Sequence, residues 1–277
     1  MRIHRLLLSL AALLALAGAA RAASPPGQRF VVPLSHPGQP VKLEVSLIGG
    51  SIDVVPHAGN EVVVEAAPSD GDDEDEDSDH ESSRSRSGMH RLPNRSLGLV
   101  VEEDANHVTV GMGGIPHEVV LRIQVPRQAS VSLSTVNDGE ISVEGLDGTL
   151  ELNNTNGGIT AKDVAGSVVA HTTNGDIKVT MTRVNANAPM AFATFNGDVD
   201  VSLPAGTRGN LRLRSDNGEI YTDFDVQLTS QAPKVEQHKT GGKYRLEVEQ
   251  DVAGSLNGGG PDIQLRTFNG DIYLRKK

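Results

Sequence analysis

Carboxylate side chains recur at one position of a repeated sequence, and they are the residues whose spacing could support chemistry. Each follows a turn ending in Gly and precedes Ile or Val; they are Glu140, Asp176, Asp198, Glu219 and Asp271. If the repeats stack in register, these carboxylates form a row. Such a row could bind Ca²⁺ or cationic sugars, and two of its members could act as acid and base in polysaccharide cleavage.

A structural role explains the same row without a reaction. Gly158 stands at the equivalent position of one repeat and interrupts the row. An acidic side chain at the start of a strand can also accept a hydrogen bond from the turn backbone. We therefore predict solvated strand-start positions, neutralised across neighbouring strands by Lys178, Arg212, Arg214 and Arg266.

The other reactive residue types form no recognisable site. The chain has no cysteine, its nine histidines are dispersed, and no Gly-x-Ser-x-Gly sequence occurs. His171 is predicted to be a polar, outward-facing strand residue. The Gly258-Gly259-Gly260-Pro261-Asp262 segment has proline where a Ca²⁺-binding β-roll needs glycine, so we predict a tight turn into the last strand. No catalytic, cofactor-binding or metal-ligating residue is assigned, and no cofactor is expected.

The repeated unit itself reads Thr-x-Asn-Gly-acid-Ile/Val. Three close copies begin at Thr172, Thr194 and Thr267, and looser copies contain Gly139, Gly157 and Gly218. The apolar residue after each turn falls at positions 141, 159, 177, 199, 220 and 272. A second turn keeps the step between repeats, because residues 145–150 match residues 163–168.

Alternating apolar residues flank these turns, which is the period-2 pattern of β-strands. One unit of two short strands cannot bury its own apolar face, whereas stacked units can. Two all-β architectures fit: a β-solenoid, or β-helix-like stack of short strands joined by Asn-Gly turns, and an antiparallel meander of hairpins. Constant spacing and repeated turn chemistry favour the solenoid.

The amino terminus has the pattern of a secretory signal peptide. Arg2, His4 and Arg5 precede an apolar run of 14 residues, and Ala20-Arg21-Ala22 fits a cleavage site. The run is short for a bilayer span, and no later apolar run approaches that length. We predict export, cleavage after Ala22 and no transmembrane segment in the mature chain.

Four regions are predicted along the chain: a signal peptide at 1–22, β-strands at 23–67, an insertion at 68–96 and the β-repeat region at 97–277. The strands at 30–67 and the repeat region are expected to form one continuous β domain. The insertion contains nine acidic residues between positions 70 and 81, followed by a Ser/Arg-rich stretch. Because it has almost no apolar residues to bury, we predict a disordered surface segment.

Composition limits both the core and the partners. Only 3% of residues are aromatic and none is Trp, so Val, Leu, Ile and Ala must fill a narrow, layered interior. The net charge of −11 argues against nucleic acid as a partner, because phosphate binding needs a basic surface.

The repeats, together with Val143-Glu144-Gly145-Leu146-Asp147-Gly148, Leu203-Pro204-Ala205-Gly206-Thr207 and the carboxyl-terminal 258–272 segment, resemble a bacterial family. It is an exported β-strand-repeat family of unknown function, often labelled as adhesins. The resemblance covers about residues 41–277, is strongest from Val125 onward, and implies a β-helix-like fold in exported or surface proteins. It implies no catalytic residues.

These observations favour an exported, non-enzymatic, adhesin-like protein of the periplasm or cell surface that binds or scaffolds an envelope protein or glycan. The alternative is a carbohydrate-active β-helix enzyme, a lyase or hydrolase, that uses the row of turn-flanking carboxylates. An enzyme should have a cleft with two convergent carboxylates, whereas a scaffold should have a uniform, solvated face.

Overall fold

The chain folds into stacked β-strands. The computed structural model describes residues 28–69, 98–113, 118–137, 139–229, 234–240, 243–249 and 251–277, and in these ranges it contains strands and no helix. Twenty strands hydrogen bond into one continuous sheet, while β18 (Lys234–Thr240) and β19 (Lys243–Glu249) form a separate antiparallel hairpin. The predicted all-β class is confirmed.

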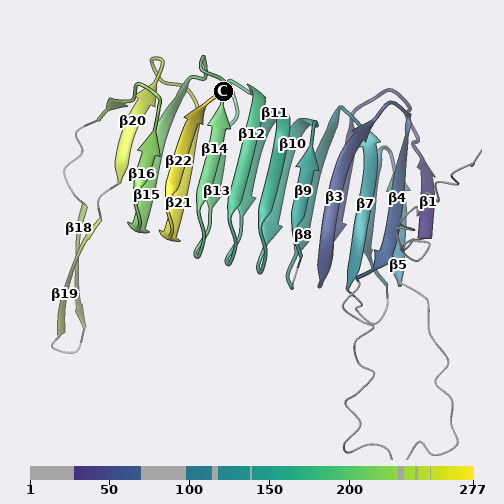
Figure 1. The fold of residues 1–277 in the computed structure, drawn as a ribbon, viewed down its shortest axis with the longest axis horizontal. Coiled ribbons are helices and arrows are strands. Elements are labelled where there is room, and N and C mark those ends of the chain that lie inside the picture. The colour runs from purple at the N-terminus through teal and green to yellow at the C-terminus, as the bar shows by residue number, and fades with distance from the viewer. Residues whose placement is uncertain are drawn as a thin grey trace, which may run out of the picture.

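The continuous sheet folds over into two facing layers (Figure 1). Layer A contains, in spatial order, β5 (Leu99–Asp104), β6 (His107–Met112), β2 (Val41–Ser46), β8 (Ala129–Thr135), β10 (Asp147–Asn154), the second half of β11 (Ile159–His171), β13 (Met190–Ala193), β21 (Asp262–Asn269), β15 (Gly209–Asn217), β20 (Val252–Leu256) and β17 (Gln227–Leu228).

Layer B is built in the same way from the strands that follow the turns. It contains, in spatial order, β1 (Gln28–Pro33), β4 (Glu61–Pro68), β7 (Val119–Pro126), β3 (Gly50–His57), β9 (Ile141–Glu144), the first half of β11, β12 (Ile177–Val184), β14 (Val199–Leu203), β22 (Ile272–Lys276) and β16 (Ile220–Thr222).

Each Asn-Gly turn carries the chain from a strand of layer A to a strand of layer B, and we call this unit a coil. Successive coils pair in parallel: β10 aligns with β11 in layer A, and β9 aligns with β11 in layer B. The turns therefore do not close hairpins. This arrangement is the predicted solenoid, and the antiparallel meander is wrong for the repeats.

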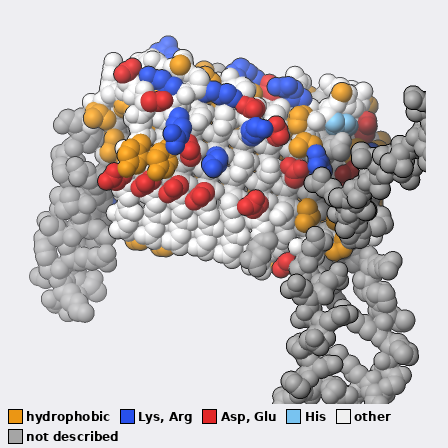
Figure 2. Space-filling model, viewed as in Figure 1, with side chains coloured by type: hydrophobic (Ala, Val, Ile, Leu, Met, Phe, Trp, Pro, Cys, Tyr) orange, Lys and Arg blue, Asp and Glu red, His pale blue; other side chains and the backbone are white. Residues whose placement is uncertain are grey.

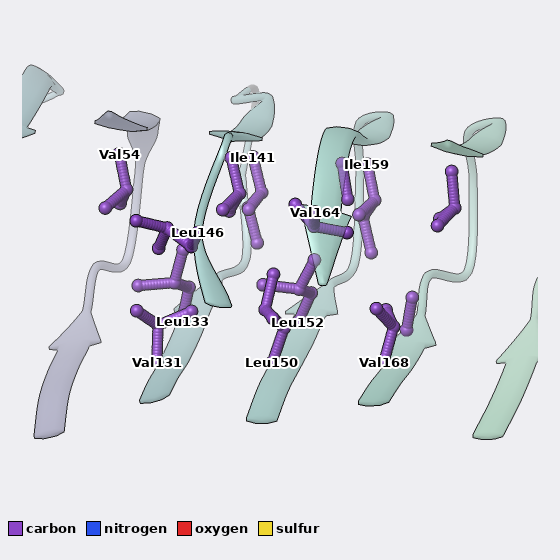
Figure 3. Close-up of a cluster of buried hydrophobic side chains, with 14 of the residues drawn as sticks. Val54, Val131, Leu133, Ile141, Leu146, Leu150, Leu152, Ile159, Val164 and Val168 are labelled. Carbon is purple, nitrogen blue, oxygen red and sulfur yellow. The ribbon is translucent and has the colours of Figure 1, made fainter. Parts of the chain in front are cut away.

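The second turn returns the chain to layer A through a bend. At this corner β11 runs without a break from one layer into the other, and its register with β12 shifts on both sides of Val164. Leu146 and Val164 occupy matching places at two successive corners and point between the layers (Figure 3). They close the side of the core that the Asn-Gly turns leave open.

The core lies between the layers and follows the period-2 pattern of the sequence. In β8, buried and half-buried residues alternate along the whole strand. Val131, Leu133, Leu150 and Leu152 face the interior from layer A, opposite Ile141 and other residues of layer B (Figure 3). Val, Leu, Ile and Ala make up nearly all of this core, as the composition predicts, with Phe192 the largest fully buried side chain.

The coils do not stack in the order of the sequence. The β21–β22 coil lies between the β13–β14 coil and the β15–β16 coil, although it follows both in the chain. At the other end, the β2–β3 coil lies between the β6–β7 coil and the β8–β9 coil. The end coils of the stack are therefore β6–β7 and β15–β16, and neither is the first or the last coil along the chain.

The predicted signal peptide and nearly all of the acidic insertion lie outside the described residues. Within the part of the chain that is described, no helix is long and apolar enough to cross a membrane.

Candidate functional site

The asparagine of the repeat forms a ladder along the turns. Asn174 donates through Nδ2 to Oδ1 of Asn156 at 2.8 Å, and Asn196 donates to Asn174 at 2.8 Å. Asn269 continues the ladder to Asn196 at 2.7 Å, and Asn217 continues it to Asn269 at 3.1 Å. Each amide is both donor and acceptor, so identical side chains satisfy one another only when the coils are in register.

The threonine of the repeat holds neighbouring coils together from inside the turn. Its hydroxyl donates to the carbonyl oxygen of the turn glycine in the preceding coil of the stack. Thr172, Thr194 and Thr267 bond in this way to Gly157, Gly175 and Gly197, at 2.9, 2.9 and 2.8 Å. These threonines are buried, and the bond satisfies a hydroxyl that would otherwise be costly to bury.

In the predicted row of carboxylates, three of the five members, Asp176, Asp198 and Asp271, bind backbone. Oδ1 of Asp176 accepts a hydrogen bond from the Asp198 backbone N–H at 2.8 Å. Oδ1 of Asp198 accepts from Asp271, and Oδ1 of Asp271 accepts from Glu219, each at 2.8 Å. Figure 2 shows a row of acidic side chains along a long face of the molecule. These three carboxylates therefore join neighbouring coils, a role that the sequence analysis did not predict.

Two tyrosine hydroxyls donate hydrogen bonds to carboxylates of the acidic row. Tyr221 donates to Oε2 of Glu219 at 2.5 Å, and Tyr273 donates to Oδ2 of Asp271 at 3.0 Å. The hydrogen bond to Glu219, and then its negative charge, raise the pKa of Tyr221 to about 12. The Tyr273 pKa is raised chiefly by its hydrogen bond to Asp271. Both oxygens of Asp271 thus have donors.

The tyrosines also form a small aromatic surface on layer B. Their rings stack with centroids 5.2 Å apart. The Arg275 guanidinium lies 4.9 Å from the centre of the Tyr273 ring, and its Nε donates to Asp200 at 2.9 Å. Each of these side chains thus has a polar partner within the protein.

The chemistry available to the acidic row is limited by this bonding. Among the described residues, no group of three or more His, Cys, Asp or Glu side chains could hold a metal ion. Two cavities of the described region lie elsewhere, since neither is lined by a residue of the row. In neither of these two cavities do carboxylates of the row converge.

The predicted neutralisation of the row is wrong for three of its four cations. Arg212, Arg214 and Arg266 lie on strands of layer A, before the turn, whereas the acidic row begins layer B. Arg214 instead bonds Asp216 through Nη2 at 2.8 Å. Lys178 alone lies in layer B, two residues after Asp176. The sequence does not reveal on which layer a strand lies until the turn is known to separate the two.

The sequence of residues 128–274 matches the Toastrack DUF4097 family. The chain belongs to that family. The matched segment begins just before β8 and ends in β22, so it includes every coil with an Asn-Gly turn. The β2–β3 and β6–β7 coils lie before the Toastrack match and complete the same stack.

Two solved structures are similar to this chain in outline. A candidate cell adhesion protein from Clostridium sporogenes is 8% identical, with 91% of this chain and 100% of that one covered and a TM-score of 0.45. A candidate adhesin from Bacteroides fragilis is 10% identical, with coverages of 92% and 98% and a TM-score of 0.37. No curated protein matches the chain.

The outer face of layer A carries a site that the sequence analysis missed. Phe195 and Phe268 occupy the variable position of two Toastrack repeats, and their rings stack in parallel with centroids 4.7 Å apart. They border a shallow depression that His171, Ala193 and Arg266 also line. The identical Thr-Phe-Asn-Gly-Asp sequences were a signal, but they are 73 positions apart and only the stacking order makes them neighbours.

Two smaller sequence predictions can be placed directly. His171 is exposed on the outer face of layer A, as expected. The 258–262 segment turns the chain into β21, with positive φ at Gly258 and Gly259 and a hydrogen bond from Gly259 N–H to the Leu256 carbonyl. The two central residues of this turn, Asn257 and Gly258, both have positive φ, and Asn and Gly are the residue types that tolerate it.

Proposed function

We propose that this chain is an exported, non-enzymatic β-solenoid that presents its outer layers to a protein or glycan of the bacterial envelope. The observation that carries the proposal is the bonding of the acidic row. Asp176, Asp198 and Asp271 each use a carboxylate oxygen to hold the backbone of the next coil. Carboxylates committed in this way support a rigid surface, which is what a binding scaffold requires.

Export is supported by the leader at residues 1–22, whose basic start, apolar run and Ala-x-Ala site suit a secretory signal. We expect the exported protein to begin at Ala23 or Ser24, which mass spectrometry of material from the periplasm or medium would determine. A protein that retains Met1 would contradict export by this route.

The binding function is tested with the mature protein and isolated envelope fragments. We expect saturable binding to the fragments and no release of new sugar ends from envelope polysaccharides. Asp176→Asn and Asp198→Asn should leave both results unchanged, since an amide oxygen can still accept the backbone hydrogen bond.

The enzymatic alternative makes the opposite prediction for these variants. If the native protein cleaves a glycan, and Asp176→Asn or Asp198→Asn abolishes cleavage while the melting temperature is unchanged, the row is catalytic. Absence of saturable binding to any envelope fraction would contradict the scaffold role directly.

A further inference from the structure

The depression on the outer face of layer A spans three neighbouring strands, β11, β13 and β21. His171, Ala193 and Arg266 lie side by side in one row across these strands. Adjacent strands are about 4.8 Å apart, so His171 and Arg266 stand roughly 10 Å apart at the backbone. The short Ala193 side chain leaves the space between them open, and it forms the floor of the depression.

The aromatic pair forms the wall of the depression on the side of the turns. Phe195 is 49% exposed and Phe268 is 40% exposed, values that set them apart from the buried aromatic residue Phe192. The volume is about 290 Å³. Pockets that enclose whole small ligands are about 300–1,000 Å³, so this space suits one ring-sized group of a longer molecule.

The charge of the depression comes from Arg266. Among the described residues Arg266 forms no ion pair, and no carboxylate lines the depression. Arg214 lies beside Arg266 on the next strand, β15, but its charge is compensated, because its Nε and Nη2 both donate to Asp216 Oδ1. Arg266 therefore presents an uncompensated guanidinium beside two exposed aromatic rings.

The combination defines the chemistry of a ligand. A guanidinium binds a planar carboxylate through two parallel hydrogen bonds. A pyranose ring has an apolar face of C–H groups that can cover an exposed phenyl ring, and His171 offers a ring nitrogen to hydroxyl groups. Nucleic acid is disfavoured because Arg266 by itself cannot compensate a phosphate backbone in a chain of net charge −11.

We propose that this depression binds one carboxylated sugar residue of an acidic glycan, with Arg266 holding the carboxylate and Phe195 covering the apolar face of the ring. The inference rests on the proposed binding function and names the class of its partner. One sugar in an open depression gives weak affinity, so tight attachment would come from many copies of the glycan residue meeting many protein molecules.

The test measures binding of trigalacturonate to the mature protein by titration calorimetry or NMR. The matched control ligand is its methyl ester, which keeps the sugar rings and loses the charge. We expect the acid to bind and its methyl ester to bind at least about tenfold more weakly. A loss of this size is expected when a charge-assisted hydrogen bond is removed. Arg266→Gln should weaken binding of the acid to a similar extent.

Two further variants separate the site from general effects. Lys178→Gln removes an exposed cation from layer B, and it should leave binding unchanged. Phe195→Ala should weaken binding of both the acid and the ester, because it removes the ring that covers the sugar. Each variant is compared at an unchanged melting temperature, and His171→Ala gives a second lining variant if Phe195→Ala unfolds the protein.

The outcomes distinguish this inference from the proposed function. Equal binding of acid and ester, or unchanged binding by Arg266→Gln, would overturn the assignment of a carboxylated sugar. If trigalacturonate does not bind while envelope fragments still do, the inference fails and the scaffold function stands. If neither binds, both fail.

Discussion

At the residue scale, each position of the repeat has a separate duty. Taking the β13–β14 coil, Thr194 bonds the Gly175 carbonyl, Asn196 bonds Asn174, and the Asp198 N–H bonds Asp176. The apolar residue that follows, Val199, is fully buried in the core. The motif thus encodes contacts between coils, and its recurrence reflects the geometry of stacking.

The turn glycine is required by the approach of the next coil as well as by its φ. A Cβ on Gly197, whose φ is 146°, would lie 2.2 Å from the Gly175 carbonyl oxygen. We predict that Gly197→Val lowers the free energy of unfolding by about 3 kcal/mol or more, because backbone strain adds to the clash. Denaturant unfolding measures the change.

Asp198→Asn is the matched control at the next residue. Its amide oxygen can still accept the Asp271 N–H, so the expected loss is below about 1 kcal/mol. Equal losses for the two variants would show that close stacking of the turns does not govern stability. Gly218 marks the limit of the φ argument: its φ is not positive, yet a Cβ there would lie 2.0 Å from the Gly270 carbonyl oxygen.

Tyr221 provides a pH-dependent probe of the same row. Its pKa, ordinarily 10.0, is raised to about 12 because the Glu219 carboxylate accepts its hydroxyl hydrogen bond. A raised pKa means that the neutral phenol is favoured in the folded protein. The contribution to stability is complete below pH 10 and is lost as the pH rises through about 12.

We predict that Glu219→Gln moves the Tyr221 ionisation back toward 10, as followed by ultraviolet titration of tyrosine, because the negative charge is removed while an acceptor oxygen remains. Tyr273→Phe removes the stacked neighbour's ionisation and simplifies the titration. An unchanged ionisation in Glu219→Gln would contradict the Glu219 carboxylate as the cause of the raised pKa.

At the element scale, the sequence predicts strands and turns well and their neighbours poorly. Alternation places β2, β7 and β8 correctly because each buries one side against the core. The stacking order escapes such reasoning, because parallel strands of similar sequence pair equally well in several orders. The interval of 52 residues between Ile220 and Ile272 contains β20 and the β18–β19 hairpin. This length of chain lets β21 and β22 pair on the inner side of the β15–β16 coil, between it and the β13–β14 coil.

The acidic row could be predicted from the sequence, whereas the depression on layer A could not. The acidic row follows from spacing alone, since Asp176 and Asp198 belong to successive coils both in sequence and in space. The depression does not, because Phe195 and Arg266 meet only when the β21–β22 coil is inserted beside the β13–β14 coil. Residues joined by a stacking order can be identified only once that order is known.

A pair of core substitutions tests the inserted coil. Ile272 is fully buried between coils, whereas Ile220 is half-buried in the last coil of layer B. We predict that Ile272→Ala costs about 2–5 kcal/mol and that Ile220→Ala costs clearly less, as measured by denaturant unfolding. Stacking in sequence order would place Ile272 at the end, and it would reverse this ranking.

At the scale of the whole molecule, strands paired antiparallel to the coils cover both ends of layer A and one end of layer B. In layer A, β5 covers one end, while β20 and β17 cover the other. In layer B, β4 and β1 cover one end, and the three-residue β16 is the last strand at the other. At one end the edge strands β17 and β16 are only two and three residues long, and at the other end β5 runs against the direction of its neighbour. Both features limit pairing with another stack, which protects a solenoid from growing end to end.

The stack also predicts how protection from hydrogen exchange varies over the molecule. Interior coils have neighbours on both sides, so their backbone amides should open only with much of the structure, while end strands can fray alone. We therefore predict slower exchange for Ile272–Lys276 of β22, which pairs with both β14 and β16, than for Ile220–Thr222 of β16, which pairs with β22 alone. Proximity to the carboxyl terminus would predict the reverse, because terminal residues usually exchange first. Exchange measured by NMR under native conditions compares the two strands in one sample. Slower exchange in β16 than in β22 would contradict the inserted position of the last coil.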